Sequence, residues 1–394
     1  MTQMDTAQAS APNRRPKAAA DGLVARVLLA FLATAGLFYV NIMPALVDGL
    51  VTGLDFSKRD AGLVGSLNVY GAALGAFAIV LVVKRLAWRR AAYAMLLTLL
   101  ALDALSILVT TPMALMALRF VHGVVGGALV GVGFAVIARA SDPDKTFGML
   151  LLVQFGLGGL GVMYLPRLVP EYGTAVLFLS LIAFTLVTLA MVPFLDDYPV
   201  ARPHAEQDSA AGIEKRPLAL TLAALFLFQG ANMGLYAYIL PLAEAAGLGT
   251  EFTSRTLGQA AWVGILGSGL VVLFSVRFGR TWPLLLAIGL TAVGTWGLHL
   301  SEREWVFWLA NVGIGVTWAF VIPYLLGMAA AFDRHGQMAA LGGFASKMGL
   351  ASGPMVAALL VGEGNYTLLI NLAVGALLLC IAVMLPPARR LDRR

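Results

Sequence analysis

The chain has 394 residues, of which 60% are hydrophobic and 12% charged, and its formal net charge is +6. A water-soluble protein of this size needs far more polar surface to cover its core, so the composition excludes a soluble enzyme, a nucleic-acid binder and a disordered chain. The sequence contains one cysteine, Cys380, which excludes a disulfide within the chain.

Apolar segments long enough to cross a bilayer recur along the whole chain. A transmembrane helix needs about 20 mostly apolar residues. Twelve segments meet this length, at residues 24–47, 60–83, 91–111, 113–138, 146–167, 172–195, 217–243, 254–276, 282–300, 304–329, 337–361 and 365–386. The first is too long for the core of a signal peptide. We therefore predict an all-α membrane protein with 12 transmembrane helices in two six-helix bundles.

Polar segments and positive charges set the organisation and the orientation. The predicted parts are an N-terminal tail (1–22), a first bundle (23–195), a linker (196–216), a second bundle (217–386) and a basic tail (387–394). With the N-terminus inside, the inner segments hold 20 Lys and Arg residues and the outer loops hold 5. Because positive charge stays on the cytoplasmic side, both termini and the linker are predicted to be cytoplasmic. The expected location is a multi-pass position in the cell inner membrane.

The two halves repeat each other at an offset near 197 residues. The matching positions are Tyr39 and Tyr236, Pro44 and Pro241, Asp48 and Glu244, Arg59 and Arg255, and Gly156 and Gly353. Each match alone is weak, because Gly and Pro are common in membrane helices. Their agreement on one offset indicates a duplication, and a site between repeated halves is typical of secondary transporters.

Short motifs lie in the turns after spans 2 and 8 and within spans 4 and 11. The turns read Lys84-Arg85-Leu86-Ala87-Trp88-Arg89-Arg90 and Arg277-Phe278-Gly279-Arg280. Span 4 carries Leu115, Arg119, His122 and Gly123, and span 11 carries Gly349, Gly353 and Pro354. Together with the twelve spans and the repeat, these motifs resemble the major facilitator superfamily over residues 24–386.

The resemblance implies alternating access between two bundles, with spans 1, 4, 7 and 10 lining a central cavity. It favours the branch that exchanges drugs or metabolites for protons. The residues it implies for gating are Arg85, Arg277, Gly279, Arg280, Gly353 and Pro354. It also implies that the arginine of span 4, Arg119, faces the cavity.

Ionisable residues inside spans are costly, so they mark candidate functional positions. Asp103 and Arg119 lie ~12 Å and ~10 Å from the outer ends of spans 3 and 4, which a short turn joins. We predict that they pair, either as a structural ion pair or as a pair that opens when Asp103 takes a proton. His122 either relays protons or acts as a neutral hydrogen-bonding group. These three residues are the predicted proton-coupling set.

Lys347 is predicted ~15 Å deep in span 11, without an acidic partner at equal depth in its own half. Three functional interpretations are open for this lysine: it loses its proton, it pairs with Asp103 across the cavity, or it binds an anionic ligand. The other interpretation is a purely structural role.

Polar and aromatic residues form stripes on the spans expected to line the cavity. Packing between helices would also explain any one of them. The predicted substrate-binding residues are Tyr39, Asn41, Arg119, Gln154, Gln229, Asn232, Tyr236, Asn311, Trp318 and Lys347.

The sequence lacks a phosphate-binding glycine-lysine loop, a metal-ligand spacing and a nucleophile–base pair, so we predict no enzyme activity and no cofactor. An ion gradient, most simply of protons, is the expected energy source. The predicted function is export of drugs or metabolites by a monomer whose partners are a small molecule, protons and the lipid bilayer. The alternatives are a carrier of a small organic anion and a membrane receptor that does not transport.

Overall fold

The structure is a computed structural model that describes residues 17–20, 22–82, 85–140, 143–198, 214–274, 277–332, 337–361 and 364–394. Its regular elements in these ranges are helices. Most of the predicted tail (1–22) and of the predicted linker (196–216) lies outside the described residues, as does Lys84 of the first basic turn.

The first bundle accounts for spans 1 to 6. Its elements are α1 (Leu23–Ala35), α2 (Phe38–Asn41), α3 (Met43–Leu54), α4 (Lys58–Val82), α5 (Trp88–Leu108), α6 (Pro112–Ile137), α7 (Pro143–Tyr172), α8 (Ala175–Met191) and η1 (Val192–Phe194). Span 1 consists of α1, α2 and α3, and each later span is one long helix.

The second bundle accounts for spans 7 to 12. Its elements are α9 (Lys215–Ala237), α10 (Ile239–Ala245), α11 (Thr250–Phe274), α12 (Thr281–Gly297), η2 (Leu298–Leu300), α13 (Glu304–Ala331), α14 (Gln337–Val361) and α15 (Tyr366–Asp392). Span 7 consists of α9 and α10.

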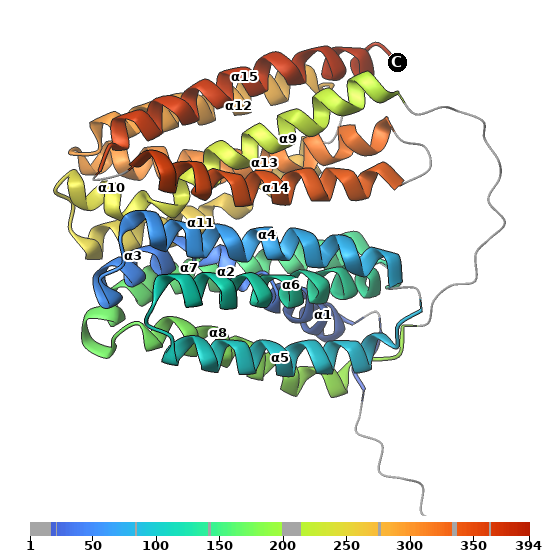
Figure 1. The fold of residues 1–394 in the computed structure, drawn as a ribbon. Helices are drawn as coiled ribbons and strands as arrows, with labels where there is room; N and C mark the ends of the chain where they lie inside the picture. Colours follow the sequence, from blue (N-terminus) through green and yellow to red (C-terminus); the bar gives the residue numbers. More distant parts are fainter. Residues whose placement is uncertain are drawn as a thin grey trace, which may run out of the picture.

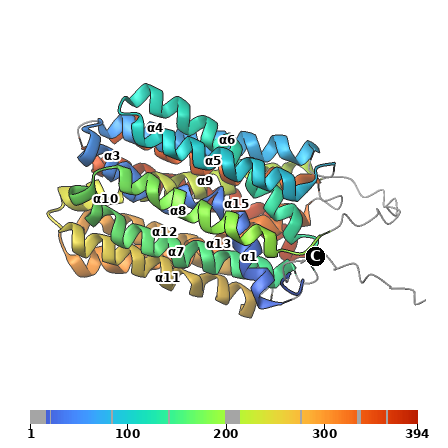
Figure 2. The ribbon, with the colours of Figure 1, turned by 90° about the horizontal axis from the view of Figure 1, so that it is seen from below.

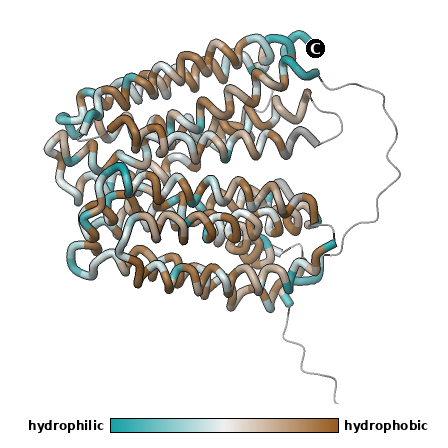
Figure 3. The backbone as a smooth tube through the Cα atoms, in the orientation of Figure 1, coloured by the Kyte–Doolittle hydropathy of each residue, from teal (hydrophilic) through white to brown (hydrophobic). Residues whose placement is uncertain are grey.

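The two bundles lie against each other with their helices roughly side by side (Figures 1 and 2). They meet mainly where α4 packs against α14 and where α7 packs against α11. Hydrophobic residues run along the helices, and hydrophilic residues gather at the two ends (Figure 3). Within the described residues, 10 helices are individually long and apolar enough to cross a membrane. The distribution of hydrophobic residues therefore fits a bilayer around the sides of the molecule.

The surface along the sides of the helices exposes many large apolar side chains. Leu81, Leu108 and Trp282 are 73%, 77% and 73% exposed, and many other exposed leucines accompany them. Soluble monomers rarely expose such continuous apolar surface. The predicted all-α membrane fold with twelve spans is confirmed.

Spans 1 and 7 are both interrupted at repeat-related positions. The break in span 1 follows Asn41, and the helix resumes as α3 with Pro44 in its first turn. The break in span 7 lies at Tyr238, and α10 then includes Pro241. Proline has no N–H to donate to the preceding turn, so a helix restarts more readily at these positions than it continues.

Within the first bundle, glycines let α4 and α6 approach closely. A Cβ atom at Gly75 would overlap the carbonyl oxygen of Val124, and one at Gly127 would overlap that of Ala72. Small residues at helix contacts are typical of membrane proteins, because close backbone approach replaces the missing hydrophobic driving force.

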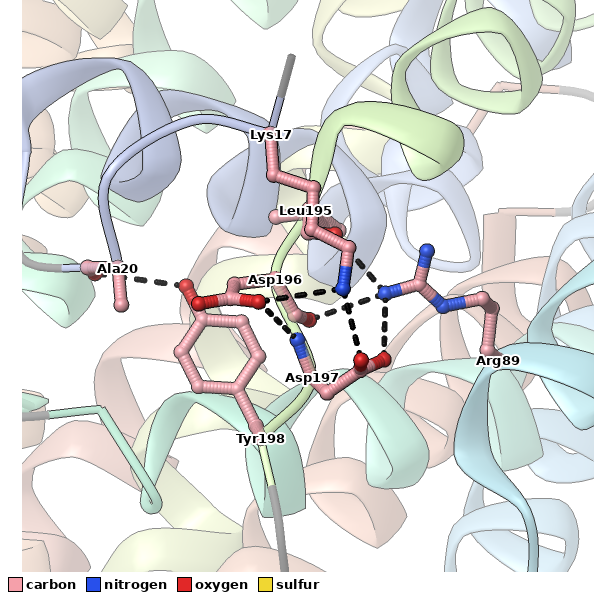
Figure 4. A network of polar contacts seen from close by, with 7 residues as sticks. All are labelled: Lys17, Ala20, Arg89, Leu195, Asp196, Asp197 and Tyr198. Atoms are coloured by element: carbon pink, nitrogen blue, oxygen red, sulfur yellow. Dashed lines mark hydrogen bonds and ion pairs between the residues drawn. The ribbon is translucent and has the colours of Figure 1, made fainter. Parts of the chain in front are cut away.

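A charged network ties together three segments at the end of the first bundle that the sequence predicts to be cytoplasmic (Figure 4). Lys17 Nζ lies 2.7 Å from Asp197 Oδ2 and 3.2 Å from Asp196 Oδ1, and Arg89 Nη2 lies 3.0 Å from Asp197 Oδ1. The hydrogen bond from Lys17 lowers the pKa of Asp197, and the same bond raises the pKa of Lys17. The network therefore holds the segment before α1 and the start of α5 against the end of span 6.

Candidate functional site

A cavity of about 110 Å³ lies between the two bundles. The first bundle contributes residues of α2 and α7, and the second contributes residues of α9, α11 and α13. Its polar and aromatic lining residues are Asn41, Gln154, Phe155, Asn232, Tyr236, Asn311 and Trp318. Six of these seven are predicted substrate-binding residues, whereas Phe155 was missed because it interrupts no apolar pattern in span 5.

Asn41 lies at the break in span 1 and joins both bundles. Its side-chain Nδ2 donates to the carbonyl oxygen of Gln154 at 2.9 Å. Its backbone carbonyl accepts a hydrogen bond from the Tyr236 hydroxyl at 3.1 Å. The helix break makes that carbonyl available to a group from the other bundle.

Asn232 and Asn311 come from the middle of long helices. Each donates its side-chain Nδ2 to the carbonyl oxygen four residues earlier, to Phe228 at 2.7 Å and to Phe307 at 2.8 Å. Both side chains are nearly buried, with 7% and 8% exposed. The amide oxygen of Asn232 is buried without a hydrogen-bond partner among the described residues.

Gln229 lies behind the cavity wall. Its Oε1 accepts from Trp318 Nε1 at 2.6 Å, and its Nε2 donates to Ser346 Oγ at 2.8 Å. It does not line the cavity, although the sequence predicted direct contact with a substrate. With both ends of the amide engaged, Gln229 fixes the position of the Trp318 ring.

A second polar cluster is sealed inside the first bundle. Arg119 Nη1 lies 2.6 Å from Asp103 Oδ1, and the two side chains are 0% and 1% exposed. The ring of Tyr39 lies against the guanidinium, with 4.5 Å from Cζ to the ring centroid, and Phe178 lies at 5.6 Å. The pairing of Asp103 with Arg119 agrees with the prediction from the short turn between spans 3 and 4.

The surroundings of His122 specify a neutral ring. Asn68 Nδ2 donates to the carbonyl of Arg119, so it faces His122 Nδ1 as a donor, at 2.9 Å. Arg119 Nη2 also approaches Nδ1, at 3.1 Å. His122 Nε2 lies 3.2 Å from Asp103 Oδ1. Because two donors face Nδ1, the proton of the imidazole belongs on Nε2, where the carboxylate accepts it.

Two predicted substrate ligands lie elsewhere than expected. Arg119 and Tyr39 do not line the cavity, because they point into the first bundle towards Asp103. The stripe on span 4 marks a face that avoids lipid, and here that face packs against span 3.

Lys347 is partly exposed in the middle of α14 and forms no hydrogen bond or ion pair with another described residue. It shares a helix face with Phe344 and Ala351, which contact Phe77 and Ser66 of α4. It does not line the cavity, and Asp103 is occupied by Arg119 and His122. Of the alternatives considered for Lys347, the pairing with Asp103 is therefore absent from this structure.

The second basic turn is held by a residue that sequence reasoning missed. Gly279 adopts a positive φ of 67°, which favours glycine. The N–H groups of Arg280 and Thr281 then donate to the two carboxylate oxygens of Asp392, at 2.7 and 2.9 Å. No local pattern would have linked Asp392 to a turn more than a hundred residues earlier.

The remaining predicted gating residues lie in turns or within α14. Arg85 lies in the turn before α5, and Arg277 in the turn after α11. Gly353 meets the backbone of Gly230 on α9, and Pro354 lies inside α14.

Three hydrogen bonds join the bundles at the end predicted to face away from the cytoplasm. Arg167 donates to Ser254 Oγ and to the carbonyl of Glu251, both at 3.0 Å. The Tyr238 hydroxyl donates to the carbonyl of Lys58 at 2.7 Å. We call these three contacts the outer latch, because they join the two bundles at that end. Sequence reasoning missed Arg167, which it counted only as a loop charge.

The chain was compared with known proteins. The family model of the Major Facilitator Superfamily matches residues 27–332. The crystal structure of a point mutant of the nucleoside transporter NupG is similar in fold, with a TM-score of 0.70 and 14% sequence identity over 92% of this chain and 98% of that chain. No curated protein matches the sequence. The protein therefore belongs to the major facilitator superfamily, and it is a multi-pass membrane transporter of small molecules rather than an enzyme.

Proposed function

We propose that this protein is a proton-coupled exporter that moves a small organic drug or metabolite across the inner membrane as a monomer. The observation that carries the proposal is the cavity between the bundles, which residues of both bundles line. The outer latch joins the same two bundles at one end. Transport by alternating access requires a site at such an interface, because rocking one bundle against the other then exposes it to each side in turn.

The cluster of Asp103, Arg119 and His122 supports proton coupling. Protonation of Asp103 would remove the counter-ion of Arg119, and a buried charge without a partner is strongly unfavourable. Arg119 packs on the Tyr39 ring, and Tyr39 lies two residues before Asn41 on the cavity wall. Breaking the ion pair would release Arg119 from its position against Tyr39, and a movement of Tyr39 would shift α2 and with it the cavity wall at Asn41.

A carrier of a small organic anion is the second candidate, because Lys347 has no anionic partner among the described residues. The described lining residues of the cavity include no charged side chain, which favours the first proposal.

The test uses purified protein in proteoliposomes with an imposed pH gradient. Flux is measured for a panel of labelled lipophilic cations, neutral metabolites and organic anions. The coupling variant is Asp103→Asn combined with Arg119→Gln, which removes both charges together and leaves no unpaired buried ion. We expect the wild type to accumulate solute against its gradient and the double variant to carry the same solute only downhill.

Accumulation against the gradient by the double variant would refute the coupling role of the cluster. The absence of gradient-dependent flux for all three classes of solute would refute proton-coupled transport of these solutes. The direction of transport is tested with inside-out membrane vesicles that have an acidic interior. Uptake of the solute into these vesicles corresponds to its export from the cell.

A further inference from the structure

A second cavity, of about 150 Å³, is a groove on the outside of the second bundle. It lies where α14 and α15 each pack along α9 but meet each other little, so that α9 forms the floor and the other two helices form the walls (Figure 1). The lining residues Phe226, Val356 and Leu372 are 38%, 48% and 44% exposed, so the groove is open along the side of the molecule. The hydrocarbon of the bilayer is therefore the medium that meets this groove.

Small residues give the groove its depth. Gly230 and Gly234 of α9 have no side chains, and Ala373 and Ala376 of α15 carry only a methyl group. Two glycines at this spacing can mark a contact between membrane helices of two chains. Here a Cβ atom at Gly353 of α14 would overlap the carbonyl oxygen of Gly230, and one at Gly234 would lie against that of Gly353. The glycine pair is therefore already used inside the bundle rather than between two copies.

The chemistry of the groove suits an apolar occupant. Apart from Ser352, its described lining residues are apolar. The hydroxyl of Ser352 already forms a hydrogen bond with the hydroxyl of Tyr70 on α4, at 2.8 Å. A ligand that placed a polar group in the groove would give up hydrogen bonds to water without equivalent ones in return, which is unfavourable.

The position and length of the groove match the acyl chain of one leaflet. Its lining residues run from Leu360 to Ser352 on α14 and from Leu369 to Ala376 on α15. Each stretch covers about two turns of helix, or ~10–12 Å. Both stretches begin within one turn of the helix end that is predicted to face away from the cytoplasm. In a hydrocarbon layer about 30 Å thick, the groove therefore lies in the half away from the cytoplasm.

We propose that the groove between α14 and α15 binds one acyl chain of a phospholipid from the leaflet away from the cytoplasm. The chain enters near Leu360 and Leu369, and its methyl end lies towards Ser352 and Ala376. In the groove the chain contacts protein on three sides, whereas a chain against the convex face of a single helix contacts protein on one side. The dispersion attraction between chain and protein is larger in the groove for that reason.

The test uses the full-length protein in proteoliposomes of phosphatidylethanolamine and phosphatidylglycerol. A small fraction of the phosphatidylethanolamine carries a diazirine on one acyl chain, either near the carboxyl group or near the methyl end. After illumination, mass spectrometry of peptides locates the labelled residues. The reference surface is the lipid-facing side of α8, where Leu179 and Leu186 are 51% and 49% exposed.

We expect labelling per residue to be about tenfold higher in the groove than on α8, because the bound chain makes more contacts. The diazirine near the carboxyl group should label Leu360 and Leu369. The diazirine near the methyl end should label Ser352 and Ala376.

A pair of matched variants tests whether the shape of the groove is responsible. Ala376→Phe fills the deep end of the groove with a ring, and it should lower labelling of the groove by the methyl-end probe to the level on α8. Ala183→Phe makes the same substitution at an exposed position of α8 and should leave labelling of the groove unchanged.

Equal labelling of the groove and α8, the reverse order of the two probes along the groove, or undiminished labelling in Ala376→Phe would each overturn the inference. Cross-links between two copies of the chain at the lining residues, in place of lipid label, would assign the groove to an oligomer contact and would also overturn it. The pattern in the wild type decides the order and the enrichment without any variant, so the test does not depend on the folding of Ala376→Phe.

Discussion

Gln229 determines the shape of the cavity without lining it. Gln229→Leu removes both of its hydrogen bonds, to Trp318 and to Ser346. A neutral carboxyl group in Gln229→Glu keeps both, because it accepts from Trp318 and donates to Ser346. We expect Gln229→Leu to weaken binding of a cavity ligand about tenfold, because a freed Trp318 loses its fixed orientation. Gln229→Glu should bind within about threefold of the wild type. Calorimetric titration of both variants checks this, and equal affinities in the two would contradict a positioning role.

A second prediction concerns the contribution of the ion pair between Arg119 and Asp103 to stability. Arg119→Met leaves a carboxylate buried without its cation, and we expect it to cost about 3–5 kcal/mol of unfolding free energy. The double variant Asp103→Leu with Arg119→Met removes both charges and should recover most of that loss. Thermal unfolding in detergent measures both. A double variant as unstable as the single one would show that packing, rather than charge, dominates at this position.

Helices and their ends were largely predictable because the thickness of the bilayer fixes the length of a span. The second span was predicted at 60–83 and α4 covers Lys58–Val82. The break in span 1 was not predicted. Residues 35–43 are mostly apolar apart from Asn41, so their hydropathy gives no sign that the helix ends there. The break is a feature of the backbone geometry.

The rotation of each helix could not be predicted from its polar stripe. A stripe identifies the face that avoids lipid, but that face meets either the cavity or a neighbouring helix. Asn311 and Arg119 both lie on such stripes; Asn311 lines the cavity, whereas Arg119 turns to Asp103. The difference comes from a partner on another span, which becomes visible only when the helices are packed together.

The close contact of α4 and α6 gives an expectation at the scale of the element. Gly127→Ala places a methyl group against the carbonyl oxygen of Ala72, so the two helices must move apart. We expect a loss of about 1–3 kcal/mol in unfolding free energy. Gly289→Ala on α12 is the control, because a Cβ atom there meets nothing within 4 Å, and it should be neutral or slightly stabilising. Equal stability of the two variants would contradict the role of close packing.

At the scale of the whole molecule, the outer latch must open in every transport cycle. A short bismaleimide joining Arg167→Cys and Ser254→Cys should hold the latch closed and abolish flux, while ligand binding persists. The native Cys380 is buried, so the reagent reaches the introduced pair selectively. Each single-cysteine variant, treated in the same way, is the control. Undiminished flux in the linked protein would exclude movement of the bundles at this end.

The break in span 1 also supplies a spectroscopic reporter. The carbonyl of Asn41 is free of the helix ladder and takes its hydrogen bond from Tyr236 of the other bundle. When the bundles separate at this level, that bond is lost, and the carbonyl stretching vibration shifts to higher frequency. An isotope label on this one carbonyl would therefore let infrared spectroscopy follow the opening of the interface, without a dye or a spin label attached to the protein.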